Sequence, residues 1–298
     1  MRRRSHRRPD EPAGRRGPTA RPKSVTFKRD RSNLASTFAG LRRRGARALI
    51  PYFTAGDPSL SVTRQLVVEA AKRGADIIEL GIPFSDPLAD GPVIQRAVQR
   101  ALAAGVTLPR VIELVREMRD EVAAPLVFLT YYNPILAFGL KAFCHAAAEA
   151  GVDGVIVADL PPEEAGPLRA EADPAGLELI HLVAPTSTPE RMRKIARATG
   201  SFIYMVSLTG VTGARAELPP DLTQHLRVLR GLTTKPICVG FGIGTAEQAA
   251  LVGRVADGVI VGSAIVTLVE RYAGSRELLS QVGDFIAALK APLREASA

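Results

Sequence analysis

Short apolar runs alternate with longer amphipathic segments along the chain from residue 46 onward. The runs are rich in Val, Ile and Leu and are bounded by Gly, Pro or Asp, which predicts buried strands. The segments between them place apolar residues three or four positions apart, which predicts helices with one buried face. The predicted strands are residues 48–54, 76–80, 126–130, 154–158, 177–182, 202–206, 236–239 and 258–261.

The predicted helices fall between these strands and at both ends of the series. They cover residues 61–73, 92–103, 108–121, 140–150, 162–172, 189–198, 222–230 and 246–252, followed by a helical region at 264–289. A further helix at 33–43 precedes the first strand and is expected to cover the bottom of the fold.

Strict alternation of strands and helices indicates parallel strands, because parallel neighbours need a crossover connection. Eight such units favour a closed TIM (β/α)8 barrel over an open doubly wound sheet, since closure leaves no edge strand exposed. No Pro/Ser/Gly-rich linker interrupts the rhythm. We therefore expect residues 32–298 to form one TIM-barrel catalytic domain with an extra N-terminal helix.

The net charge of +9 changes this picture only at the N-terminus. Residues 1–31 contain twelve Lys or Arg and three Asp or Glu, so they carry the whole excess and the remaining chain is neutral. This segment is rich in Arg, Pro and Gly and poor in large apolar residues, which predicts a disordered basic tail. Two interpretations stay open: an extension without function, or a weak electrostatic contact with nucleic acid or another anion.

Several classes of protein are disfavoured by the remaining composition. Cys144 and Cys238 are far apart and form no metal-binding or redox spacing, which argues against a disulfide framework and fits a reducing cytoplasm. The histidines show no ligand spacing, so no metal is expected. No apolar segment follows the N-terminal arginines as in a secretory signal, and the uncharged run at 122–140 is interrupted by prolines, so no membrane span is expected.

The second predicted strand ends in a candidate catalytic carboxylate. In a barrel the active site lies at the carboxyl ends of the strands, and alternation places Glu79 on the same side as Ile77, facing the interior. Glu79 is either an ion-paired residue at a strand end or a proton-transfer group whose pKa is raised by apolar surroundings. Asp86 and Asp90 follow in the loop. Asp90 also suits a helix start, and spacing does not choose between the two aspartates.

Glycines directly after the last two predicted strands indicate a phosphate site. Residues 240–244 (GFGIG) and the pair Gly262-Ser263 each lead into a predicted helix, whose N-terminal N–H groups attract anions. A dinucleotide fingerprint is the rival interpretation, but it would be expected early in the fold with an acid after the next strand. The loop at 207–214 has two glycines and three hydroxyls, and is either a simple turn or a mobile lid over the site.

At these residues the sequence resembles the tryptophan synthase alpha subunit family. The resemblance covers roughly residues 33–289, and residues 1–31 have no counterpart in the family pattern. It rests on residues 50–58 (IPYFTAGDP), 79–92 (ELGIPFSDPLADGP), 131–134 (YYNP), 159–161 (DLP), 210–213 (GVTG), 240–244 (GFGIG) and 262–263 (GS).

The resemblance implies a reaction and a set of site residues. The family reaction is retro-aldol cleavage of indole-3-glycerol phosphate to indole and glyceraldehyde 3-phosphate. Glu79 and Asp90 match the two catalytic carboxylates, which resolves the choice against Asp86. The resemblance further implies substrate contacts at Tyr52, Tyr131, Tyr204 and Thr212, and phosphate contacts at Gly213, Gly242, Gly262 and Ser263.

The resemblance also implies partners and cofactors. The alpha subunit needs no cofactor of its own, whereas the beta subunit that receives the indole carries pyridoxal phosphate. An alpha2beta2 tetramer in the cytoplasm is therefore expected. Two other hypotheses remain: a different phosphosugar barrel enzyme, which should lack the pair of carboxylates, and a nucleic-acid-binding module, which would depend on the tail.

Overall fold

Parallel strands form the central sheet of this protein. The computed structural model describes residues 33–206, 218, 220–240 and 242–294. Within them the strand order is β5-β4-β3-β2-β1-β9-β8-β7-β6, with every pair parallel. The strands are β1 (Ala48–Thr54), β2 (Ile78–Gly81), β3 (Leu126–Thr130), β4 (Gly154–Val157), β5 (Glu178–Ile180), β6 (Leu182–Val183), β7 (Ile203–Val206), β8 (Ile237–Gly240) and β9 (Gly258–Val261).

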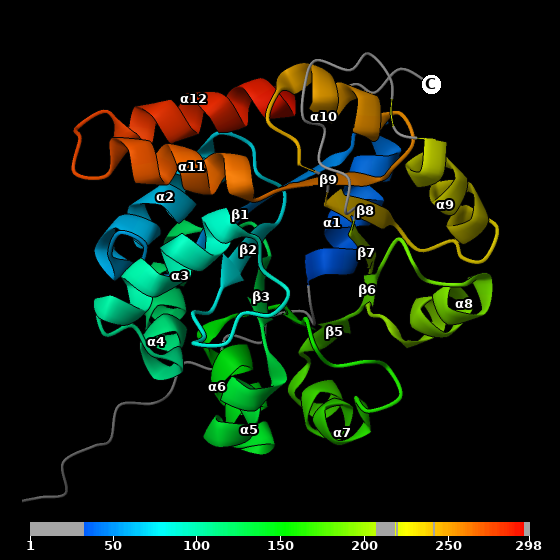
Figure 1. Cartoon of the computed structure of the whole chain (residues 1–298), viewed down its shortest axis with the longest axis horizontal. Helices are drawn as coiled ribbons and strands as arrows, with labels where there is room; N and C mark the ends of the chain where they lie inside the picture. The colour runs from blue at the N-terminus through cyan, green and yellow to red at the C-terminus, as the bar shows by residue number, and fades with distance from the viewer. Residues whose placement is uncertain (1–32, 207–217, 219, 241, 295–298) are drawn as a thin grey trace, which may run out of the picture. The chain divides into compact units, whose positions relative to one another are not determined.

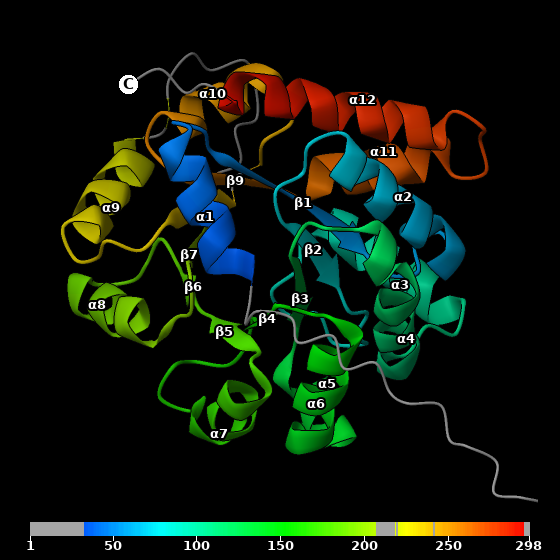
Figure 2. The ribbon, with the colours of Figure 1, turned by 180° about the vertical axis from the view of Figure 1, so that it is seen from behind.

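Helices surround the sheet, as Figure 1 shows, and the arrangement is that of a TIM barrel. Helix α1 (Asn33–Arg43) lies across one end of the barrel, as predicted, and is seen from that side in Figure 2. The others are α2 (Leu60–Lys72), α3 (Pro92–Ala103), α4 (Leu108–Met118), α5 (Tyr132–Phe138), α6 (Leu140–Ala150), α7 (Gly166–Ala175), α8 (Pro189–Ala198), α9 (Pro220–Arg230), α10 (Ala246–Gly253), α11 (Ser263–Tyr272) and α12 (Leu278–Lys290). Short 3-10 turns cover Arg119–Glu121 and Ala291–Leu293.

The fifth predicted strand is divided in two at His181. Its first half, β5, pairs with β4, and its second half, β6, pairs with β7. The two halves of one predicted strand therefore form the two ends of the sheet order. The eight-unit barrel is confirmed, and the ninth strand results from this division.

Three helix predictions need correction. Helix α7 begins at Gly166, later than the predicted start at residue 162, and runs to Ala175, where Gly176 with φ of 75° ends it. The region 264–289 is two helices, since the chain turns at Gly274 with φ of 79°. Helix α5 was not predicted because of Pro134, yet a proline is tolerated in the first turn of a helix.

Two apolar layers lie on opposite faces of the strands. Inside the barrel, alternate strand residues such as Ile50, Ile77 and Ile260 pack with Phe38 of α1. Outside, the intervening residues pack against the helices. Ile77 belongs to the interior layer whereas Ile78 and Leu80 belong to the outer one, so Glu79 faces the interior, as alternation predicted.

Aspartates close the barrel at the amino ends of several strands. Their carboxylates accept the backbone N–H of the neighbouring strand's first residues: Asp76 from Leu49, Asp153 from Leu126 and Asp257 from Ile237, at 2.8–2.9 Å. Each carboxylate also pairs with a cation, from Lys290, Arg119 and Arg230 respectively. Before β7 the equivalent position is Ser201, which instead donates its N–H and hydroxyl to Glu178 at 2.6 and 2.8 Å. This end of the barrel is therefore built for stability.

The predicted tail, residues 1–31, lies outside the described residues, so its disorder and the domain division beside it stay predictions. A hypothesis that relies on the tail for nucleic-acid binding is likewise outside them. Among the residues that the structure does describe, no helix is both long and apolar enough to cross a membrane.

Candidate active site

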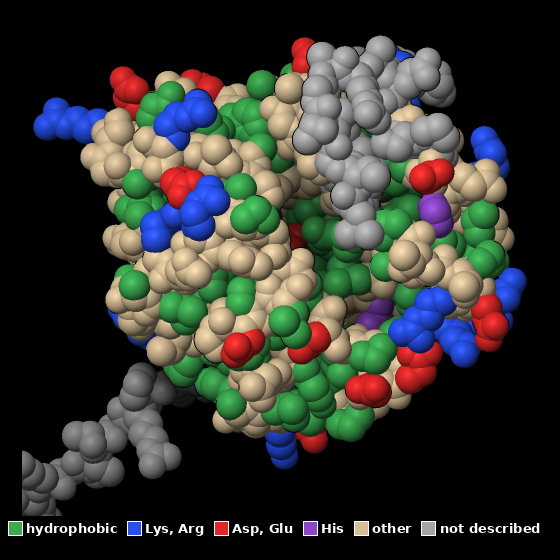
Figure 3. All heavy atoms as spheres, viewed as in Figure 1, with side chains coloured by type: hydrophobic (Ala, Val, Ile, Leu, Met, Phe, Trp, Pro, Cys, Tyr) green, Lys and Arg blue, Asp and Glu red, His purple; other side chains and the backbone are tan. Residues whose placement is uncertain are grey.

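The carboxyl ends of the strands carry those predicted site residues that the structure describes. Tyr52 lies on β1 directly opposite Glu79 in the register with β2, while Tyr131 follows β3 and Tyr204 lies on β7. Figure 3 shows this face of the molecule, hollowed at the centre of the ring and lined there mainly by hydrophobic side chains. The site thus combines a carboxylate and aromatic side chains inside an apolar wall.

Glu79 is the most unusual group in this region. Its side chain is 1% exposed, and neither carboxyl oxygen has a hydrogen-bond partner among the residues that the structure describes. Burial, with a smaller contribution from the negative charge of Asp90, raises its pKa to about 8. A carboxyl group with this pKa holds a proton at neutral pH and releases it readily, which suits general acid and base catalysis.

Asp90 lies in the loop between β2 and α3 and is half-buried. Burial raises its pKa, and a hydrogen bond from the Tyr131 hydroxyl works in the opposite direction. That hydroxyl also accepts the N–H of Ala89 at 3.0 Å, so it anchors the loop. Asp86, by contrast, is exposed and accepts a hydrogen bond from Ser85 at 2.7 Å. The geometry therefore favours Asp90 over Asp86 as the partner of Glu79.

Two glycines make room for the tyrosines. The sequence alone did not point to this role, since Gly81 was assigned none and Gly240 was predicted to be part of the phosphate site. A Cβ atom at Gly81 would overlap the Tyr52 hydroxyl, and one at Gly240 would lie 2.8 Å from the Tyr204 ring. Tyr52 also hydrogen-bonds to Thr54 at 3.1 Å. Burial raises the pKa of both tyrosines above the usual range, so they stay neutral donors. Their signal in the sequence is a glycine at a strand end, which by itself does not show that a tyrosine packs against it.

The N-terminus of α11 is the candidate phosphate site. Gly262 precedes this helix and Ser263 opens it. The first bond within the helix runs from Val266 N–H to the Gly262 carbonyl at 3.0 Å, so the earlier N–H groups have no acceptor in the helix and are suited to an anion. Gly262 faces Tyr52, since a Cβ added there would lie 3.7 Å from the tyrosine ring. Gly242 is exposed in the loop after β8. Thr212, Gly213 and the predicted lid at 207–214 lie outside the described residues.

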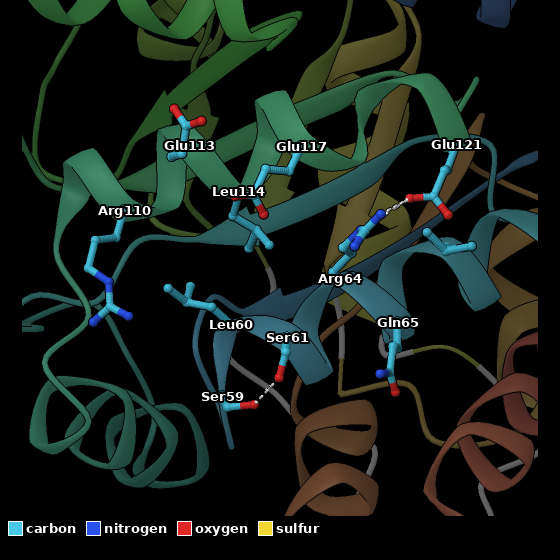
Figure 4. A pocket seen from close by; sticks show the side chains of 11 residues that line it. Ser59, Leu60, Ser61, Arg64, Gln65, Arg110, Glu113, Leu114, Glu117 and Glu121 are labelled. Carbon is cyan, nitrogen blue, oxygen red and sulfur yellow. Dashed lines mark hydrogen bonds and ion pairs between the residues drawn. The ribbon is translucent and has the colours of Figure 1, made fainter.

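A separate groove of about 710 Å³ lies on the outer surface between α2 and α4. Figure 4 shows the Arg64–Glu121 ion pair across it, together with Leu60 and Leu114. None of the predicted site residues lines this groove, so it takes no part in the site.

The described residues offer no cluster of three or more His, Cys, Asp or Glu side chains that could hold a metal ion. Among the histidines, His181 is 6% exposed, and burial lowers its pKa to about 4, so it is neutral. Its ring lies 3.3 Å from the Arg169 guanidinium, between the sheet and the helices, which is a structural role.

Comparison with known proteins agrees with the geometry. The family model for the tryptophan synthase alpha chain matches residues 38–293, which is most of the chain. The chain belongs to the tryptophan synthase alpha chain family. The alpha chain of Citrifermentans bemidjiense is 51% identical over 87% of this chain and 97% of its own length, and that of Geobacter sulfurreducens is 50% identical over 87% and 98%.

Solved structures of the alpha chain family share the fold. Tryptophan synthase subunit alpha from Legionella pneumophila superposes with a TM-score of 0.81 at 39% identity, covering 88% of this chain and 98% of its own. A structure of tryptophan synthase from M. tuberculosis gives 0.80 at 33% identity, covering 89% of this chain and 100% of its own. The chain is thus an enzyme of the lyase family whose alpha reaction cleaves indole-3-glycerol phosphate.

Proposed function

We propose that Glu79 and Asp90 are the catalytic residues with which this chain cleaves indole-3-glycerol phosphate to indole and glyceraldehyde 3-phosphate. One observation carries this assignment: Glu79 is 1% exposed, has no hydrogen-bond partner among the described residues and has a pKa of about 8, to which the charge of a second, half-buried carboxylate, Asp90, contributes. Two carboxylates in different environments suit separate roles in proton transfer and charge stabilisation.

The proton balance of the reaction requires one group that first gives and then takes a proton. Protonated Glu79 donates to C3 of the indole ring, which leaves a positive charge shared with the ring nitrogen. The resulting carboxylate then removes the proton of the substrate's 3′-hydroxyl. The hydroxyl becomes the aldehyde carbonyl, the carbon–carbon bond breaks, and its electron pair restores the indole ring. Glu79 ends protonated as it began, which is consistent with a pKa near neutrality.

Asp90 supports the charged intermediate. As a carboxylate it accepts a hydrogen bond from the indole N–H, and this bond strengthens as positive charge develops on the ring. The Tyr131 hydroxyl donates to the Asp90 carboxylate, and this hydrogen bond lowers the pKa of Asp90 against the opposite effect of burial. Tyr52, Tyr204 and Thr212 contact the rest of the substrate. The phosphate of the substrate binds at the start of α11 with Gly213, Gly242, Gly262 and Ser263.

The proposed reaction uses acid and base catalysis alone, so we propose that this chain holds no cofactor. Its product indole passes to a beta subunit that carries pyridoxal phosphate, in an alpha2beta2 tetramer in the cytoplasm. The exposed loop that carries Asp90 includes Leu88, which is 92% exposed and therefore suited to contact such a partner. Titration with a beta subunit should raise indole formation, because ordering of this loop would hold Asp90 in place.

Indole release from indole-3-glycerol phosphate by the purified chain tests the assignment. Glu79→Gln keeps the size of the side chain but removes the titratable proton, and should lower indole release by at least about 10²-fold. Glu121→Gln, which alters an exposed glutamate in the groove between α2 and α4, is the matched control and should leave activity unchanged. Activity of Glu79→Gln within a few-fold of wild type would remove Glu79 from the mechanism.

A further inference from the structure

A network of ion pairs joins α3, α11 and the loop after β1. Arg100 of α3 donates to both carboxyl oxygens of Asp57, each at 2.8 Å, and to Glu270 of α11 at 2.7 Å. Glu270 also accepts two hydrogen bonds from Arg96, at 3.0 and 3.1 Å. One guanidinium therefore bridges carboxylates from two different parts of the barrel.

The pair between Arg100 and Asp57 is more buried than an ordinary surface pair, whereas Arg96 is half exposed. The Asp57 side chain is 3% exposed, and those of Arg100 and Glu270 are about one-third exposed. Hydrogen bonds from Arg96, together with the charge of Arg100, lower the pKa of Glu270 to about 2, so it stays ionised. Bidentate pairing between a guanidinium and a carboxylate fixes both distance and direction.

An apolar cluster lies alongside the ion pairs and joins the same elements. It contains Tyr52 from β1, Ile94 and Val98 from α3, and Val266 from α11. Because well-packed side chains resist compression, α3, α11 and the Tyr52 wall of the site form one unit.

The two helices each hold one end of the candidate site. Helix α3 begins two residues after Asp90, and Gln95 in its first turn donates to the Asp90 carbonyl at 2.8 Å. Helix α11 begins at Ser263, where the phosphate is proposed to bind. The distance between the indole-binding carboxylate and the phosphate site therefore depends on how α3 is held against α11.

We propose that Arg100 and Glu270 are positioning residues that set the spacing between Asp90 and the N-terminus of α11, so that one substrate molecule can occupy both subsites together. This inference rests on the proposed function. Neither side chain is assigned a contact with the substrate, and both act through the helices that they connect.

The physical basis is the advantage of a ligand that binds two subsites at once. When indole and phosphate are linked in one molecule, the second contact forms at a high effective concentration, provided that the subsites are spaced to match the linker. A mismatch of about 1 Å can reduce the benefit by on the order of 10²-fold. Loss of the ion network should therefore weaken a ligand that spans both subsites, and leave its separate fragments unaffected.

Glu270→Ala is the variant of choice. It removes the ion-pair link between α11 and α3 but leaves the apolar cluster and the buried pair between Arg100 and Asp57 in place, so the fold should be retained. Asp284→Ala is a matched control, because Asp284 of α12 also pairs with an arginine, Arg73, that keeps a second carboxylate partner in Glu69. Glu270→Gln, which retains one acceptor oxygen, is the second variant and should show a smaller effect.

The experiment measures binding of three probes: indole, glycerol 3-phosphate and indole-3-propanol phosphate, which lacks both side-chain hydroxyls and is not cleaved. We expect Glu270→Ala to bind the two fragments within about twofold of wild type and the linked probe on the order of tenfold more weakly. Cleavage of the true substrate should fall in parallel, and Asp284→Ala should match wild type throughout.

The outcomes separate this inference from the function on which it rests. A wild-type chain that cleaves substrate and binds all three probes, with Glu270→Ala unchanged, would overturn the positioning role alone. Fragment binding weakened as much as that of the linked probe would also overturn it, because one subsite would then be damaged directly. Failure of the wild-type chain to bind the fragments or to release indole would overturn the proposed function, and the inference with it.

Discussion

The raised pKa of Glu79 predicts how stability depends on pH. The ordinary value of 4.5 applies to the unfolded chain, and the folded chain has a pKa of about 8. Between these values the folded protein keeps the proton whereas the unfolded chain releases it. The contribution of Glu79 to stability is therefore fully present below about pH 4.5 and is lost as the pH rises through about 8.

The size of this effect follows from proton linkage. Between about pH 5 and pH 7.5 the wild-type protein should lose about 3 kcal/mol of unfolding free energy through Glu79 alone, since each pKa unit corresponds to about 1.4 kcal/mol. Glu79→Gln cannot titrate and escapes this loss. Relative to wild type, the variant should therefore become more stable as the pH rises, even though it is the variant that loses activity.

Thermal unfolding of both proteins across this pH range measures the difference. The chain has no Trp, so circular dichroism is the suitable signal. For a barrel of this size, the melting temperature of Glu79→Gln minus that of wild type should rise by roughly 6–12 °C from about pH 5 to pH 7.5. Other titrating groups are common to both proteins and cancel in the comparison. Curves that stay parallel would show that Glu79 titrates at its ordinary pKa, which refutes the argument from burial.

Three further predictions concern the site and the tail. Tyr131→Phe removes the hydroxyl bonded to Asp90, so the acid limb of the pH profile of indole release should move to higher pH as the pKa of Asp90 rises. Gly81→Ala should lower activity at least about tenfold, because the added methyl overlaps a buried tyrosine hydroxyl, whereas Gly166→Ala meets no atom within 4 Å and should be neutral. Removal of residues 1–31 should leave activity and melting temperature unchanged, as too little apolar surface is present in the tail for docking; a large loss of either would show that it packs.

Local patterns were sufficient to predict most of the barrel from the sequence. The strands at residues 48–54, 126–130 and 258–261 have the predicted bounds, because continuous apolar runs bounded by polar residues specify buried parallel strands. The inward direction of Glu79 followed from alternation alone. The division at His181 was not predictable in this way, since it depends on which neighbour each half of the strand pairs with.

The sequence predicted those site residues that lie at the carboxyl ends of strands, but not the contacts between them. The contact between Tyr52 and Gly81 depends on the register of two strands, and the ion network of Arg100 joins residues far apart in the chain. Neither leaves a periodic or compositional signal. Spacing left the choice between Asp90 and Asp86 open and only the family resemblance favoured Asp90; the half-burial of Asp90 and its hydrogen bond from Tyr131 depend on the fold of the loop.

The hydrogen bonds that join the amino ends of neighbouring strands predict which part of the barrel unfolds first. At the amino ends of three pairs of neighbouring strands, an aspartate accepts a hydrogen bond from the next strand and also pairs with a cation. At the start of β7 the corresponding hydrogen bond runs from Ser201 to Glu178 of β5. The same part of the sheet contains the division between β5 and β6. Two irregularities thus coincide, so the amide hydrogens along β5, β6 and β7 should exchange with solvent before those of β1 and β2. The barrel then opens first between β5 and β6, which are the two ends of the sheet order. The strands around β1 and β2, which carry Tyr52 and Glu79, lose their structure last.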